Sequence, residues 1–171
     1  FKEARTPAYQ KWAHNVVKNA QALAEALKGY GIPLQTGGTD NHLMLCDVTV
    51  YGLTGKQAEA ALFECGITAN ANALPYDKNG AWWTSGVRLG TPALTTLGMN
   101  ENDMKEVASI LDFVLKGTKP GVAKDGKPAK GKIVLDPAVK EAARKRVNAL
   151  LSAHVLYPEL DLDFLKKEFV K

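Results

Sequence analysis

The polar side chains between residues 67 and 98 are those whose types and spacing could do chemistry in this 171-residue chain. They stand among apolar residues and glycines, where an unpaired buried polar group is costly. Amides both donate and accept hydrogen bonds, and a guanidinium binds a carboxylate through two parallel bonds. This segment is therefore the part of the chain best suited to ligand recognition. Its polar residues are Asn70, Asn72, Thr84, Ser85, Arg88, Thr91, Thr95 and Thr96.

Arg88 lies in the middle of Ser85-Gly86-Val87-Arg88-Leu89-Gly90, a short predicted strand flanked by glycines. Side chains alternate along a strand, so Arg88 should point to one face while Val87 and Leu89 point to the other. Glycine neighbours allow a ligand to approach the backbone closely. From the residues alone two interpretations stay open: Arg88 pairs with a carboxylate inside this chain, or it binds the carboxylate of a ligand.

The first third of the chain alternates between helix and strand. Apolar residues recur every three or four positions from Pro7 to Tyr30, which predicts an amphipathic helix. Short strands are predicted at 33–36 and 42–48, on either side of a glycine-rich turn. The second strand is apolar on nearly both sides, which predicts burial of both faces. Thr54 is a suitable N-cap for a helix over 55–65.

The remaining elements place the polar segment within an α+β fold. We expect a small mixed or antiparallel sheet covered by helices. Turn-forming residues interrupt the pattern at 75–80. The predicted elements are a strand at 67–70, a strand at 85–89, a short helix opened by Thr91-Pro92, a helix from Asn102 to Gly117 and a last long helix from Asp136 to about His154.

A lysine-rich stretch, residues 118–135, separates the last two predicted long helices. Lysines alternate there with Gly, Pro and Ala against a single Asp125. This composition predicts a solvated loop, and a phosphate-binding strip is the alternative. The stretch lacks aromatic residues for stacking on bases. The net charge of +4, from 22 basic and 18 acidic residues, is too small to imply nucleic-acid binding.

The two cysteines, Cys46 and Cys65, are 19 residues apart and show no metal-ligand spacing. We expect two buried free thiols in a reducing cytoplasm. The longest apolar stretches fall far short of the roughly 20 residues needed to span a bilayer, so no membrane association is expected. The chain begins with Phe1 and without an apolar signal core, which suggests a truncated or processed polypeptide.

Four ordered motifs resemble the small-domain motifs of serine hydroxymethyltransferases. The resemblance is strong from Phe1 to Leu115 and weaker to the end. It implies the C-terminal domain of the aminotransferase-like, fold type I pyridoxal-phosphate enzymes. It also implies a small domain at 1–117 led by a helix at 1–30, the lysine-rich loop at 118–135 and a C-terminal helical extension at 136–171. The motifs are Gly37-Gly38-Thr39-Asp40-Asn41-His42, Gly52-Leu53-Thr54-Gly55-Lys56, Gly66-Ile67-Thr68-Ala69-Asn70-Ala71-Asn72, and Thr84 to Thr96.

The resemblance also implies roles for individual residues. Arg88 matches the family arginine that holds the carboxylate of serine or glycine. Asn72 matches the family asparagine that hydrogen-bonds the pteridine of tetrahydrofolate. Thr84 and Ser85 are expected to support the strand of Arg88 rather than act as catalytic hydroxyls, and His42 is expected to be structural.

For the full-length protein, the resemblance implies an enzyme of one-carbon metabolism and amino-acid biosynthesis. It would interconvert serine and glycine with pyridoxal phosphate as cofactor and tetrahydrofolate as cosubstrate. The implied partners are these molecules, the large domain of the same enzyme, and further copies in a homodimer or tetramer, with no nucleic acid. The family's cofactor lysine lies in a Thr-His-Lys motif that this chain lacks, so the isolated chain is expected to be inactive.

Three departures from the family pattern accompany the resemblance. Ala71 and Leu97 replace common basic residues, and Trp82-Trp83 replaces a smaller pair, which predicts tighter packing of that loop or a contact with a neighbouring domain. Two other functions remain as alternatives. The lysine-rich stretch alone supports a basic RNA-binding or regulatory module, and a free-standing interaction domain derived from the enzyme is the other.

Overall fold

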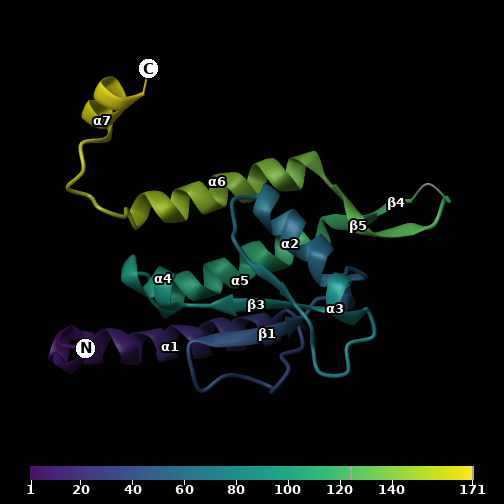
Figure 1. Ribbon diagram of the computed structural model, residues 1–171, viewed down its shortest axis with the longest axis horizontal. Helices are drawn as coiled ribbons and strands as arrows, with labels where there is room; N and C mark the ends of the chain where they lie inside the picture. Colours follow the sequence, from purple (N-terminus) through teal and green to yellow (C-terminus); the bar gives the residue numbers. More distant parts are fainter. Residues whose placement is uncertain (124, 171) are drawn as a thin grey trace.

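The computed structural model describes residues 1–123 and 125–170 and shows an α+β fold, which confirms the predicted class (Figure 1). A three-stranded antiparallel sheet packs against helices, and a separate two-stranded hairpin projects from the body. The helices are α1 (Pro7–Gly29), α2 (Gly55–Glu64), α3 (Gly80–Trp83), α4 (Pro92–Thr96), α5 (Glu101–Lys116), α6 (Pro137–Ala153) and α7 (Leu162–Phe169), with 3-10 turns η1 (Glu3–Arg5) and η2 (Thr49–Tyr51). The strands are β1 (Leu43–Asp47), β2 (Asn70–Asn72), β3 (Gly86–Gly90), β4 (Thr118–Val122) and β5 (Pro128–Leu135).

The three-stranded sheet has the order β1-β3-β2, so β3 is its central strand. Met44, Cys46 and Val87 are buried on the face that packs against the helices. Leu43 and Leu45, which point to the opposite face, are only partly buried. The predicted burial of both faces of this strand is therefore wrong, because the helices among the described residues cover one face of the sheet only.

The core lies between the covered sheet face and helices α1, α2 and α5. It contains Leu23 and Leu27 of α1, Leu62 of α2, and Met104 and Leu111 of α5, all 2% exposed or less. Each fully buried side chain of this size contributes roughly 1.5 to 3 kcal/mol through the hydrophobic effect. Helix α6 packs on the outer side of α5, and its Ala143 is fully buried. The predicted apolar stripes thus point into one common core.

Polar side chains fix the ends and the mutual packing of the helices. Thr54 caps α2 in a capping box with Gln57, as its position in the sequence predicts. The buried Thr91 hydroxyl donates to the Val16 carbonyl oxygen of α1 at 2.8 Å. The buried Asn19 amide donates to Thr95 Oγ1 at 2.9 Å. Thr91 and Thr95, two of the polar residues between 67 and 98, therefore join α4 to α1 and serve a structural role.

The lysine-rich stretch differs from its prediction. Instead of a loop it forms the antiparallel β4–β5 hairpin, in which Thr118 pairs with Leu135 and Val122 with Pro128. Ile133 and Leu135 alternate with exposed neighbours and pack against the core. That alternation supplies the buried side needed for a strand, although lysine and glycine dominate the composition. Lys124, one of the five lysines of the stretch, lies outside the described residues.

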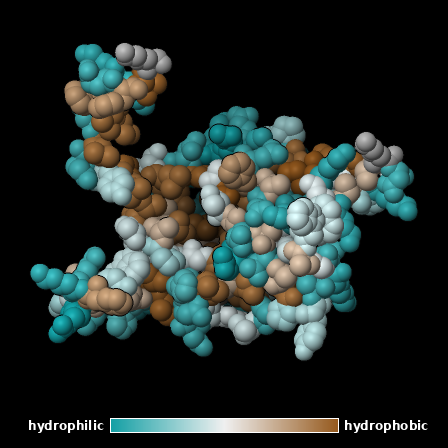
Figure 2. Space-filling view, viewed as in Figure 1, coloured by the Kyte–Doolittle hydropathy of each residue, from teal (hydrophilic) through white to brown (hydrophobic). Residues whose placement is uncertain are grey.

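Smaller differences concern the strand boundaries and the tail. Residues 33–36 contribute only an isolated bridge between Leu34 and Cys46, and β2 begins three residues later than the predicted 67–70 strand. Helix α7 lies within the expected C-terminal helical extension, although no separate helix was predicted there, and it stands apart from the body at the end of a linker (Figure 1). A cleft of about 300 Å³, lined by apolar residues of α4, α5 and α6 that include Leu94, Val107 and Leu150, opens beside α6 in the hydropathy view (Figure 2). No helix among the residues described is long and apolar enough to cross a bilayer.

Candidate functional site

Arg88 lies at the centre of the sheet face that the helices leave uncovered. In the ladder it is opposite Leu45 of β1 on one side and Asn70 of β2 on the other. Its neighbour Val87 is 2% exposed and points into the core, whereas Arg88 is exposed, as alternation predicts. Within the described part of the chain, no carboxylate forms an ion pair with Arg88. The interpretation of Arg88 as the partner of an internal carboxylate is therefore wrong for the residues that the structure describes.

Asn72 occupies the same face of the sheet as Arg88. It pairs with Gly86, two positions from Arg88 along β3, so its side chain projects to the same side. Its amide nitrogen donates to the Ala73 carbonyl oxygen at 2.8 Å, which fixes the side chain next to the backbone. A guanidinium and two amides, those of Asn70 and Asn72, thus share one open surface. Such a surface can bind a carboxylate and a hydrogen-bonding heterocycle side by side.

Thr84 and Ser85 are buried at the start of β3, at 4% and 6% exposure. The Thr84 carbonyl oxygen accepts a 2.9 Å hydrogen bond from the Gly55 backbone N–H. The Ser85 hydroxyl donates to Asp77 Oδ1 at 2.6 Å. The Thr84 hydroxyl in turn donates to the Gly86 carbonyl oxygen at 3.5 Å, so both side chains already have hydrogen-bond partners at the edge of the open face.

Asp77 organises the connection between β2 and β3. Its carboxylate accepts hydrogen bonds from the backbone N–H groups of Leu74 at 3.0 Å, Asn79 at 2.8 Å and Ser85 at 2.7 Å. Partial burial raises the pKa of Asp77, but the Ser85 hydroxyl and these N–H groups outweigh it and hold the pKa below its ordinary value. Asp77 was not among the residues expected at the site. The signal available was an aspartate in a Pro-Tyr-Asp turn, where aspartate commonly bonds the following backbone.

Glu59 of α2 is a second support that was not expected from the sequence. Its Oε1 accepts a 3.0 Å bond from the Ala71 N–H in β2, and its other oxygen pairs with Lys56 at 2.9 Å. Burial raises the pKa of Glu59, but the Ala71 and Lys56 contacts outweigh it and lower the pKa overall. Glu59 thus attaches the strand of Asn72 to the helix layer. Only the folded chain brings residues 59 and 71 together.

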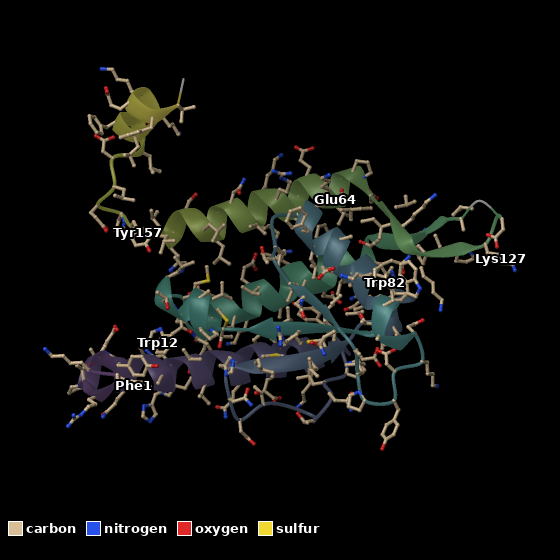
Figure 3. All side chains as sticks on the ribbon, viewed as in Figure 1. Phe1, Trp12, Glu64, Trp82, Lys127 and Tyr157 are labelled. Atoms are coloured by element: carbon tan, nitrogen blue, oxygen red, sulfur yellow. The ribbon has the colours of Figure 1, made fainter. Side chains whose placement is uncertain are left out.

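The residues that depart from the family pattern, Ala71, Leu97, Trp82 and Trp83, each occupy a definite place in the fold. Ala71 lies on the opposite face of β2 from Asn72 and packs near Val87. Leu97 is partly buried against the core. Trp82 and Trp83 meet edge to face with ring centroids 6.5 Å apart, and only Trp82 is strongly exposed, at 76%. Figure 3 shows Trp82 near the base of the hairpin whose tip carries Lys127.

Other side chains offer little nucleophilic or metal chemistry. Cys46 and Cys65 are free and buried, as predicted, and burial raises the pKa of Cys46 to about 12. No lysine among the described residues is buried, so none offers the desolvated amine that a Schiff base with a cofactor requires. No group of three potential metal ligands occurs in the described ranges. His42 is exposed at the start of β1, where its carbonyl oxygen accepts the Thr91 N–H at 3.0 Å.

Comparison with known proteins gives the family. The sequence model of serine hydroxymethyltransferase matches residues 1–111. Relatives named serine hydroxymethyltransferase are 52% identical over 160 residues in Salinispora tropica, 48% over 171 in Treponema pallidum and 49% over 160 in Mycolicibacterium smegmatis. The matches cover 94%, 100% and 94% of this chain but 34%, 30% and 32% of the respective relatives, so the chain spans about a third of their length. The open face with Arg88 and Asn72 lies within the matched residues, and the chain belongs to the serine hydroxymethyltransferase family.

Proposed function

We propose that this chain supplies the substrate-carboxylate and folate contacts of a serine hydroxymethyltransferase. The full-length enzyme would interconvert serine and glycine and transfer the one-carbon unit to and from tetrahydrofolate. One observation carries the proposal: Arg88 is exposed on the central strand, has no ion-pair partner among the described residues, and shares its sheet face with Asn72. The family membership of the chain supports it.

Arg88 binds the carboxylate of the amino acid in this proposal. A guanidinium forms two parallel, charge-assisted bonds to a carboxylate, which fixes the plane of the bound molecule. Because β3 pairs with a strand on each side, the backbone of Arg88 is held by the ladder. A rigid backbone reduces the entropy lost on binding and orients the substrate for transfer.

Asn72 contacts the pteridine of tetrahydrofolate in this proposal. An amide side chain donates and accepts at once, which suits the mixed donor and acceptor edge of a heterocycle. Thr84 and Ser85 act as supports, since the Ser85 hydroxyl is already bonded to Asp77. The open sheet face is then a surface toward which the large domain of the same enzyme presents its own groups.

Pyridoxal phosphate would supply an electron sink for the amino acid when bound. The described residues of this chain contain no buried lysine to hold it, so we assign its attachment to the large domain and derive no step through it. By itself the chain would be inactive. The proposal includes a homodimeric or tetrameric full-length enzyme. It also includes a cytoplasmic location, which the free state of Cys46 and Cys65 supports.

The test is a spectroscopic titration of the full-length enzyme with serine. Arg88→Ala should weaken the apparent serine affinity at least tenfold, because a charge-assisted hydrogen bond contributes on the order of 1.5 to 3 kcal/mol. Arg88→Lys keeps the charge but loses the paired geometry, so it should weaken binding as well. Both variants should keep their thermal stability and their bound pyridoxal phosphate, because Arg88 is exposed.

Arg144, an exposed arginine of α6, provides the matched control. Arg144→Ala should titrate with serine as the wild type does. A wild-type titration curve from a well-folded Arg88→Ala enzyme would remove Arg88 from the site. That result would favour the alternative of a non-catalytic interaction domain derived from the enzyme.

A further inference from the structure

The β4–β5 hairpin lies beyond residues 1–111, yet it is bonded to the N-terminus of α2. The Thr54 hydroxyl donates to the Lys130 carbonyl oxygen at 2.7 Å. The Gln57 amide nitrogen donates to the carbonyl oxygens of Ala129 at 2.6 Å and Lys132 at 2.8 Å. Gln57 is 1% exposed, so these bonds are shielded from water. The hairpin is thus bonded to the body of the molecule by buried contacts, although its described lysines, Lys119, Lys127, Lys130 and Lys132, are exposed.

Trp83 connects the same hairpin to the loop between β2 and β3. A Cβ atom at Gly131 of β5 would lie 2.6 Å from Cζ3 of Trp83, so the indole occupies the space that any other residue at 131 would fill. Trp83 is half-buried in this position, whereas its neighbour Trp82 is exposed. The two tryptophans therefore have different environments: Trp83 packs on the hairpin, whereas Trp82 is exposed to solvent.

The N-terminus of α2, which contacts the hairpin, also contacts the start of β3. The Gly55 N–H donates to the Thr84 carbonyl oxygen at 2.9 Å. A Cβ atom at Gly55 would lie 2.4 Å from the Gly86 carbonyl oxygen, so helix and strand are in close contact there. The hairpin, the first turn of α2 and residues 84–86 are consequently packed against one another, and Thr84 is only 4% exposed.

Thr84 itself requires such support. Its φ angle is +54°, in the left-handed region that residues other than glycine rarely adopt. A conformation of this kind persists only when the surrounding structure fixes it. Thr84 ends the loop that begins after Asn72 and directly precedes Ser85, which the Asp77 carboxylate holds. Releasing Thr84 would therefore loosen the segment that closes the folate side of the open face.

We infer that the β4–β5 hairpin positions the substrate loop between Asn72 and Ser85, and that Trp83 is the positioning residue through which it acts. The inference rests on the proposed function, because it assigns the hairpin to the folate side of that site. Arg88 is held by ladder pairing on both sides, whereas Asn72 is the last residue of an edge strand next to the loop. Loosening the loop should accordingly affect the folate contact more than the carboxylate contact.

The first test uses Gly131→Val and Trp83→Ala in the full-length enzyme. Both should raise the KM for tetrahydrofolate about fivefold, the equivalent of one net hydrogen bond, while kcat and the serine titration stay within about twofold of wild type. Val134→Ala is the matched control, because Val134 lies on the exposed side of β5 at 60% exposure and should change neither value. Thermal melts establish that each variant is folded.

The second test is hydrogen exchange on the 171-residue chain and needs no activity. In Gly131→Val the amides of Asp77, Thr84 and Ser85 should exchange faster than in wild type, while those of β1 should not. If Gly131→Val does not fold, Trp83→Ala gives the same comparison. Wild-type exchange at these three amides, or equal losses of serine and folate binding with a lowered melting temperature, would overturn the inference. A normal serine titration of Arg88→Ala would instead refute the proposed function, and the exchange result would still decide the role of the hairpin.

Discussion

Replacing Gln57 by alanine should weaken the attachment of the hairpin to the body of the protein. The change removes the buried amide that donates to Ala129 and Lys132 and accepts from the Thr54 N–H at 2.9 Å. An ordinary intramolecular hydrogen bond contributes about 0.5 to 1.5 kcal/mol, and a buried group left without a partner costs about 1 to 3 kcal/mol. Water can reach some of the freed carbonyls once the hairpin moves, so we expect a total loss of about 2 to 4 kcal/mol rather than the full sum.

A loss of this size is measurable in a chain of this length. One kcal/mol shifts the melting temperature of a domain of 150 to 250 residues by about 2 to 4 °C, so Gln57→Ala should melt roughly 4 to 16 °C lower. Circular dichroism melts provide the assay. Gln21→Ala, at an exposed position of α1, is the control and should melt within about 2 °C of wild type. If Gln57→Ala melted like Gln21→Ala, the two hydrogen bonds from Gln57 to Ala129 and Lys132 would not contribute to holding the hairpin.

Two further changes test the packing around the open face. Gly55→Ala should lower the melting temperature strongly or prevent folding, because its Cβ would lie 2.4 Å from the Gly86 carbonyl oxygen, whereas Gly38→Ala, with no atom within 4 Å, should be tolerated. Asp77→Asn tests the lowered carboxylate pKa by urea denaturation at several pH values. A folded-state pKa below the ordinary 3.8 means that the unfolded state binds more protons in acid, so the contribution of Asp77 is complete above about pH 5 and is lost as the pH falls through the folded-state pKa. The variant should be less stable at neutral pH and should lose less stability in acid; an unchanged pH dependence would contradict this assignment.

Local signals account for what could be predicted from the sequence. The cap at Thr54 depends on residues within one turn, and Thr54 caps α2 as predicted. The alternation through Val87, Arg88 and Leu89 depends only on strand geometry, so the face of Arg88 could be predicted as well. Both features are decided by neighbours in the chain.

The features that could not be predicted depend on residues distant in the sequence. The lysine-rich stretch becomes a hairpin because Gln57 and Thr54, more than 70 positions earlier, satisfy its carbonyl groups. The burial of Leu43 and Leu45 was overestimated because an apolar pattern does not reveal whether a second layer is present. In each case composition describes the side chains correctly, but the partner that decides the structure lies elsewhere in the chain.

The pairing of β3 between two strands restricts how this protein can change in length. A strand has a period of two, so inserting or deleting one residue within β3 would carry Val87 to the open face and Arg88 into the core. The connecting segments have no such alternation. Residues between Asn72 and Thr84, or at the hairpin tip near Asp125, can be added or removed without moving a side chain to the other face of the sheet. Length variation among descendants of this sequence should therefore accumulate in those two connections, while the number of residues from Gly86 to Gly90 stays fixed.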